Sequence, residues 1–208
     1  MKDRLDIEER YNVYTHFFGI ILSIVGLLWL LATLEFTSVR SMTGIAVYGF
    51  SLIFLFSAST IYHWSKEKQR PFWQKIDHIG IFILIAGTYT PVSLTTLYER
   101  SGLGLFIAVW SIALIGFIFK LFYTGRYERL SLLLYLTMGW LVVFAYKDVM
   151  DLFSTTALLY LIAGGFFYTF GVIFYRWERL KFHHVIWHVF VLLGALSHFL
   201  MVQSLLKL

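Results

Sequence analysis

Two histidines stand four positions apart near the start of the last apolar stretch, in the order His184-Val185-Ile186-Trp187-His188. On a helix, both imidazoles lie on the same face, about 6 Å apart along the axis. Two imidazoles presented in this way can hold one metal ion. Zinc at a catalytic site takes three protein ligands and leaves the fourth position for water. The pair therefore predicts a metal site whose third ligand comes from elsewhere in the chain.

The residue types that could supply this ligand are few. The chain of 208 residues has no cysteine, which excludes thiolate ligands and disulfides. A metal site must then be built from histidine, carboxylate or hydroxyl groups, and the search narrows to seven histidines and a small number of acids.

The elements that would position these residues are expected to lie in a membrane. Hydrophobic residues make up 59% of the chain and charged residues only 14%, and the mean hydropathy is +0.75. Soluble domains are much less apolar, so the sequence predicts a multi-pass protein of the cell membrane. The net charge of +5 would suggest nucleic acid in a soluble protein, but here membrane topology accounts for it. No nucleic-acid partner is expected.

Seven apolar segments are long enough to cross a hydrocarbon core of about 30 Å. The gaps between them are short, with no linker-like tract and no persuasive repeat, so we expect a single domain over residues 1–208. The predicted fold is an all-α bundle of seven transmembrane helices. The expected spans are Asn12–Leu34, Thr43–His63, Ile76–Leu97, Leu103–Tyr123, Leu130–Tyr146, Thr155–Tyr175 and His183–Leu206.

The positive charges are divided unequally between the two sides of this bundle. Of the 17 lysines and arginines, 13 belong to the side of the N-terminal lead and the even-numbered gaps, with Lys120 at the end of the fourth span counted there, and four fall in the odd-numbered gaps and the tail. Because cytoplasmic loops collect Lys and Arg, the N-terminus is expected in the cytoplasm and the C-terminus outside. This orientation is the reverse of that of G-protein-coupled receptors. No heterotrimeric G protein is expected as a partner.

Several polar residues within the spans fall at the same depth. His63 ends the second span on the predicted cytoplasmic side, Asp77 begins the third there, and His184 and His188 begin the seventh. Ser59 lies one turn before His63 on the same face and could hydrogen-bond toward whatever His63 binds. Ionisable residues within spans usually face a partner. We therefore predict a zinc site with His63, His184 and His188 as ligands.

The same residues carry a resemblance to a known family. The chain resembles the haemolysin III branch of the progestin and adipoQ receptor family over nearly its whole length. In this family seven helices run with the N-terminus inside, and three histidines hold zinc near the cytoplasmic face. The resemblance implies His63, His184 and His188 as those ligands, Asp77 as the aspartate beside the zinc-bound water, and Ser59 as the family serine. The resemblance rests on the residues and motifs Glu8-Glu9, Asn12, Thr15-His16, Gly19, Ser59-x-x-x-His63, Lys75-Ile76-Asp77-His78-Ile79-Gly80, and His184-x-x-x-His188 with His198.

Three functional hypotheses follow. The first is a zinc-dependent hydrolase that cleaves an amide or ester bond of a lipid inside the bundle, since family relatives resemble alkaline ceramidases. Asp77 would then act as a catalytic group on the attacking water, with Ser59 beside it. The second is a membrane-perturbing haemolysin, for which the residues offer little support because no export signal is visible. The third is a regulator of membrane lipid state in which zinc is structural or catalytic.

Two further histidines have open roles. His16 could line the site near the start of the first span, or make a helix-packing hydrogen bond. His198 could contact substrate or water in the interior, or pair with a neighbouring helix. His78 and His183 point away from the faces of their neighbours Asp77 and His184, and we do not expect them in the site.

Overall fold

The computed structural model describes residues 6–34 and 38–206, and within them seven helical segments are long and apolar enough to cross a membrane. This number agrees with the sequence prediction. Lys2, Arg4 and Lys207, which enter the charge distribution, lie outside the described residues. The elements are α1 (Ile7–Thr33), α2 (Val39–Trp64), α3 (Arg70–Leu94), η1 (Tyr98–Gly102), α4 (Leu103–Tyr123), α5 (Glu128–Gly139), η2 (Trp140–Ala145), α6 (Tyr146–Leu152), α7 (Thr155–Arg176) and α8 (His183–Leu206).

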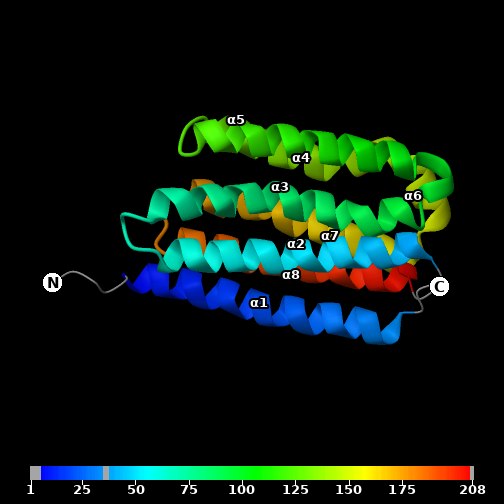
Figure 1. Cartoon of the computed structure of the whole chain (residues 1–208), viewed down its shortest axis with the longest axis horizontal. Helices are drawn as coiled ribbons and strands as arrows, with labels where there is room; N and C mark the ends of the chain where they lie inside the picture. Colours follow the sequence, from blue (N-terminus) through cyan, green and yellow to red (C-terminus); the bar gives the residue numbers. More distant parts are fainter. Residues whose placement is uncertain (1–5, 35–37, 207–208) are drawn as a thin grey trace.

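The helices form one bundle in which their long axes run roughly side by side (Figure 1). Helix α1 packs on α2 and α8, α3 packs between α2 and α4, and α7 packs on α8. Helices α1, α3, α5 and α8 begin at one end of the bundle, where α2, α4 and α7 end. We call this the histidine end, because His63, His184 and His188 lie there, and the opposite end the far end.

The central position of α2 and α3 agrees with their burial. In the most apolar 18-residue stretch of each of these two helices, more than half of the residues are buried within the protein, whereas in α7 the buried share is 17%. Large apolar side chains such as Phe122 and Phe144 are 75% and 87% exposed on the outside of the bundle. Such a surface is unfavourable in water and suits contact with lipid tails. The chain is therefore an integral multi-pass membrane protein.

Short polar side chains start three of the helices. Asp6 accepts the N–H of Ile7 at 2.6 Å, Ser38 accepts that of Ser41 at 3.2 Å, and Ser154 accepts that of Ala157 at 3.2 Å. These bonds satisfy N–H groups that have no partner within the helix. The cap at Asp6 starts α1 at Ile7, five residues before the predicted span. The stretch predicted as a polar lead thus contributes its Glu8 and Glu9 to a helix.

The fifth span also differs from its prediction. It reaches Leu152 instead of Tyr146, and it is interrupted by the 3-10 turn η2. The hydroxyl of Tyr89 donates to the carbonyl of Gly139 at 2.7 Å and accepts the N–H of Val142 at 3.0 Å. Backbone groups freed inside a membrane need such partners, so a tyrosine from α3 stabilises the irregular turn.

Candidate metal centre

Three histidines from two helices meet at the histidine end. His63 is the second-last residue of α2, and His184 and His188 occupy the first two turns of α8. One ring nitrogen from each lies within 4.8 Å of the other two. The ring centroids are 4.7 Å apart for His184 and His188, and 5.0 and 4.9 Å from His63 to each of these. Three buried or partly buried imidazoles are thus gathered as the sequence predicts, and they could hold a metal ion.

The orientation of His63 is set by a carboxylate on α1. Glu9 Oε2 lies 2.6 Å from His63 Nδ1, and Glu9 Oε1 is paired with the guanidinium of Arg70. A carboxylate accepts, so Nδ1 of His63 carries a proton, and in the neutral imidazole Nε2 keeps its lone pair. His63 Nε2 is buried and has no hydrogen-bond partner among the described residues. A buried imidazole nitrogen with a free lone pair is the donor that a divalent metal requires.

Helix α1 orients His188 in a similar way. Thr15 Oγ1 lies 2.9 Å from the carbonyl oxygens of both Tyr11 and Asn12, so its own proton is directed to the backbone. The Thr15 oxygen can therefore accept the N–H at Nδ1 of His188, 3.1 Å away. With Nδ1 protonated in this way, Nε2 of His188 is the ring nitrogen whose electron pair could bind a metal. Outer contacts of this kind fix the tautomer and ring direction of metal-ligating histidines.

The start of α8 is held against α1 as well. Glu8 Oε2 accepts the backbone N–H of Phe182 at 3.3 Å, and the rings of Phe182 and Tyr11 meet edge to face at 5.8 Å. Phe182 has φ of 60°, a left-handed conformation that bulky residues rarely adopt. The contacts to α1 therefore hold the turn from which His184 enters the site.

Asp77 and Ser59, the predicted catalytic residues, lie at this end of the bundle. The Asp77 side chain is 14% exposed, and its carboxylate interacts electrostatically with His63 and His16. It is absent from the three-nitrogen cluster. Ser59 is 1% exposed and lies one turn before His63 on α2. The catalytic roles of both residues remain predictions.

The open roles of His16 and His198 are narrowed by their surroundings. The ring of His16 stacks on that of His188, with centroids 3.5 Å apart and planes at 13°, and neither ring nitrogen has a hydrogen-bond partner in the described part of the chain. His16 therefore lies against the site. His198 packs on α7, where a Cβ added to Gly164 would come within 2.2 Å of its ring. It lies about 15 Å along α8 from His188.

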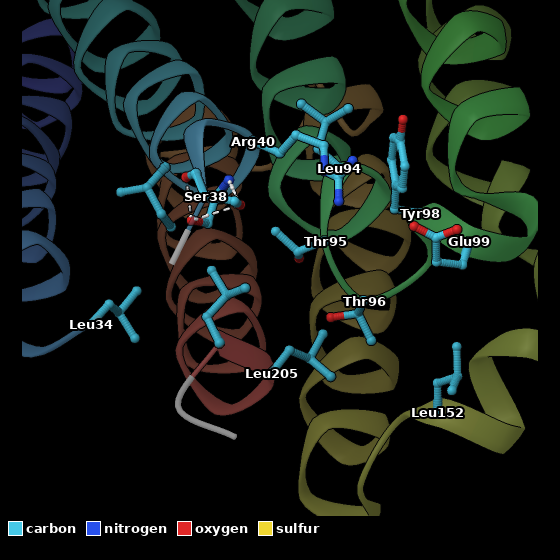
Figure 2. Close-up of a pocket in the computed structure, with 13 residues that line it drawn as sticks. Leu34, Ser38, Arg40, Leu94, Thr95, Thr96, Tyr98, Glu99, Leu152 and Leu205 are labelled. Carbon is cyan, nitrogen blue, oxygen red and sulfur yellow. Dashed lines mark hydrogen bonds between the residues drawn. The ribbon is translucent and has the colours of Figure 1, made fainter. Parts of the chain in front are cut away.

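A cavity of about 230 Å³ reaches the histidine cluster at His63 and His184. It is lined by Asp6, Glu8, Glu9, Asn12, Tyr62, His63, Arg70, His183 and His184. A larger cavity of about 490 Å³ lies at the far end, around Arg40, Tyr98 and several leucines (Figure 2). None of the predicted site residues lines the larger cavity, whereas His63 and His184 line the smaller one. His188, Asp77 and Ser59 line neither.

Comparison with known proteins agrees with this architecture. A family model described as "Haemolysin-III related" matches residues 6–199. The chain belongs to the haemolysin III family. The Hemolysin-3 homolog of Bacillus subtilis (strain 168) is 39% identical over 194 residues, which cover 92% of this chain and 91% of the relative. Hemolysin-3 of Bacillus cereus is also 39% identical, with 92% and 89% covered. The human monocyte to macrophage differentiation factor is 32% identical over 201 residues, with 92% and 82% covered.

Three contributors to the haemolysin III site had no predicted role. Glu9 and Thr15 belong to the motifs that carry the family resemblance, but only their contacts with His63 and His188 reveal what they do. His78 was not expected in the site, yet its Nδ1 lies 3.4 Å from Asp77 Oδ2. Besides that resemblance, the sequence signal for these residues was the concentration of polar residues at one depth. His183 does lie apart from the cluster, with Nδ1 3.2 Å from the carbonyl of Phe174.

Proposed function

We propose that the chain is a metal-dependent hydrolase that cleaves an amide or ester bond of a membrane lipid, with zinc as its ion. The observation that carries the proposal is the buried, unpartnered Nε2 of His63. It belongs to a cluster of three imidazoles that a cavity of about 230 Å³ reaches. A structural ion that only joined α2 to α8 would need the same three ligands, but it would not require a cavity that leads to them.

The donor set fits zinc. Neutral imidazole nitrogen is a common zinc ligand, and His63, His184 and His188 would supply the three protein ligands of such an ion. When bound at a site with three protein ligands, zinc would polarise a carbonyl and lower the pKa of a bound water molecule to about 7.

The remaining roles fall to the protein. Glu9 and Thr15 hold His63 and His188 in the tautomers that present Nε2. Asp77 accepts the proton of the attacking water, since a carboxylate near the cluster can act as a general base. Ser59 donates a hydrogen bond to the reacting groups from the same face of α2 as His63. The leaving group takes up the proton that Asp77 has accepted.

A lipid is the substrate class that best suits the position of the site. The metal centre lies inside a bundle whose outer surface is apolar, at one end of the membrane-spanning helices. The bond to be cleaved would lie at the depth of the histidine end, near the polar headgroups. The acyl chain would extend along the interior of the bundle or between its helices.

The test compares wild type with Asp77→Asn on the same preparations. Zinc content, thermal stability and product release from ceramide-like and ester lipids are measured. We expect wild type to release product and Asp77→Asn to keep its zinc while the rate falls by about 10²–10⁴-fold, the usual contribution of a general base. Folded, fully zinc-loaded wild type that hydrolyses none of these lipids would refute the proposal. The three histidines would then act as a structural staple in a regulator of membrane lipid state.

A further inference from the structure

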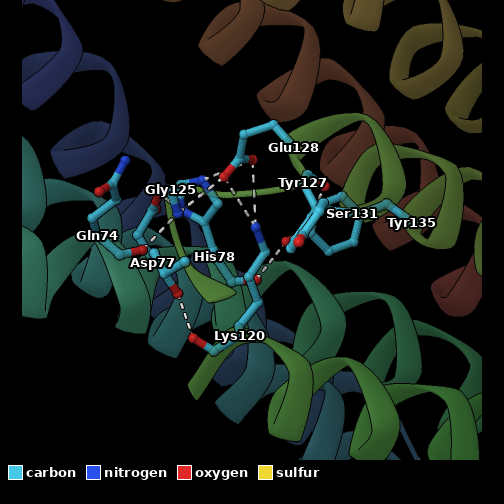
Figure 3. Close-up of polar contacts among 10 residues, drawn as sticks. Gln74, Asp77, His78, Lys120, Gly125, Tyr127, Glu128, Ser131 and Tyr135 are labelled. Carbon is cyan, nitrogen blue, oxygen red and sulfur yellow. Dashed lines mark hydrogen bonds and ion pairs between the residues drawn. The ribbon is translucent and has the colours of Figure 1, made fainter. Parts of the chain in front are cut away.

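A second group of polar side chains lies next to Asp77, on the side of α4 and α5 (Figure 3). It consists of His78 from α3, Lys120 from α4 and Glu128 at the start of α5. None of these residues has a place in the proposed function so far. All three lie at the histidine end, and their contacts lead from Glu128 to Asp77.

Lys120 is the most unusual member of this group. Its side chain is fully buried, although lysine in a membrane span is costly unless it is paired. Its Nζ lies 3.3 and 3.4 Å from the two carboxylate oxygens of Glu128. Glu128 Oε1 also accepts the N–H of Gly125 at 3.2 Å. The Glu128 carboxylate is therefore held from two sides and cannot turn freely.

His78 stands between this ion pair and Asp77. Its Nδ1 lies 2.8 Å from the carbonyl oxygen of Gln74, which can only accept, so Nδ1 carries a proton. Asp77 Oδ2 lies 3.4 Å from the same nitrogen, and Glu128 Oε2 lies 3.7 Å from Nε2 on the other side of the ring. The imidazole thus lies between two carboxylates: Glu128, which Lys120 holds, and Asp77, which shares the Nδ1 side of the ring with Gln74.

The backbone around His78 is held too. The hydroxyl of Tyr135, on α5, donates to the carbonyl oxygen of His78 at 2.9 Å. This bond joins α5 to α3 one turn past Gln74. The position of the imidazole relative to α5 is therefore set by a backbone contact as well as by its ring nitrogens.

We propose that Lys120, Glu128 and His78 are positioning residues that hold the Asp77 carboxylate in its place beside the histidine cluster. Lys120 holds Glu128, Glu128 lies beside Nε2 of His78, and Nδ1 of His78 contacts one oxygen of Asp77. This inference rests on the proposed role of Asp77 as the base. A staple that merely joined α3, α4 and α5 would stabilise the fold without affecting Asp77, so the two roles predict different results.

The main variant replaces both Lys120 and Glu128 by Met, because removing one member alone would leave a buried, unpaired charge. Kinetics are measured on the full zinc-loaded chain in lipid nanodiscs. We expect kcat to fall about 10–100-fold, as for other residues that orient a metal site from outside it, with KM and zinc content unchanged. Lys120→Arg should keep most of the rate. In an Asp77→Asn background the double replacement should cause no further loss, because its effect acts through Asp77.

Arg100→Met is the matched control. Arg100 Nη1 pairs with Asp151 at 2.8 Å and Asp148 at 3.4 Å at the far end, so the replacement breaks an ion-pair network that does not include Asp77. It should leave kcat unchanged. An unchanged kcat in the Lys120/Glu128 variant, or an equal fall with and without Asp77, would overturn the positioning role.

A second measurement does not depend on turnover. In protein labelled with ¹³C at aspartate carboxyls, the Asp77 resonance is assigned as the signal lost in Asp77→Asn. It should shift when Lys120 and Glu128 are replaced by Met, and it should stay in place in Arg100→Met. If it does not shift in the Lys120/Glu128 variant, the inference fails even where hydrolysis is found. If it shifts while no lipid is hydrolysed, the proposed function fails and the positioning contacts stand.

Discussion

Glu9 Oε2 lies 2.6 Å from Nδ1 of His63, although 54 positions separate the two residues in the chain. This contact joins the first turn of α1 to the last turn of α2 and leaves Nε2 of His63 without a hydrogen-bond partner among the described residues. It also connects the site to Arg70, at the start of α3, through the other Glu9 oxygen. A carboxylate outside the ligand set therefore determines which nitrogen of the ligand is free.

This relationship predicts the effect of Glu9→Gln. A neutral amide accepts more weakly than a carboxylate and can also present its NH₂ group to His63, so the required tautomer is no longer imposed. We expect zinc affinity to fall about 10–100-fold, measured by competition with a chelator. Glu67→Gln, at an exposed position in the α2–α3 loop, is the control and should not change the affinity. Equal affinities for the two variants would contradict the role given to Glu9.

The ligand assignment predicts a pattern among four histidines. His63→Ala, His184→Ala and His188→Ala should each lose most of the bound zinc, because two fixed donors are too few for a stable site. His183→Ala should retain it, since His183 lies beside the carbonyl of Phe174 outside the cluster. The measurement is elemental analysis of purified protein. Stoichiometric zinc in all four variants would refute the assignment.

The orientation of the bundle remains a prediction from the charge distribution. A reporter fused after Leu208 should be extracytoplasmic, and one inserted between Lys66 and Lys75 should be cytoplasmic. The result decides whether the cavity beside Glu9 and His63 faces the cytoplasm. The opposite location at both positions would place the metal centre at the other face of the membrane.

The packing of α2 against α3 predicts a difference between two glycine substitutions. A Cβ at Gly44 would lie 2.7 Å from the Cα of Pro91, a backbone atom that cannot move away cheaply, whereas a Cβ at Gly165 would meet nothing within 4 Å. Gly44→Ala should destabilise the protein by about 1–3 kcal/mol, as for other overpacked sites. Gly165→Ala should leave the thermal midpoint unchanged or slightly higher. Equal midpoints for the two variants would contradict the close approach of α2 and α3.

The sequence by itself determined the membrane class, the number of spans and the three histidines. Span number follows from apolar length, and the pairing of His184 with His188 follows from helical periodicity, both of which are local properties. His63 could be added because depth in the membrane is also set locally, by distance from the end of a span. The same argument brought Asp77 and Ser59 to the histidine end.

Only the tertiary structure decided which polar residues meet. Glu8 and Glu9 look like part of a solvated lead, and Lys120 looks like an unpaired charge near the end of the fourth span, because composition cannot reveal which residues are partners. Whether Glu9 reaches His63, or Glu128 reaches Lys120 and His78, depends on how each helix is rotated and tilted. Those angles result from close contacts between helices, such as Gly44 with Pro91, which involve the whole bundle at once.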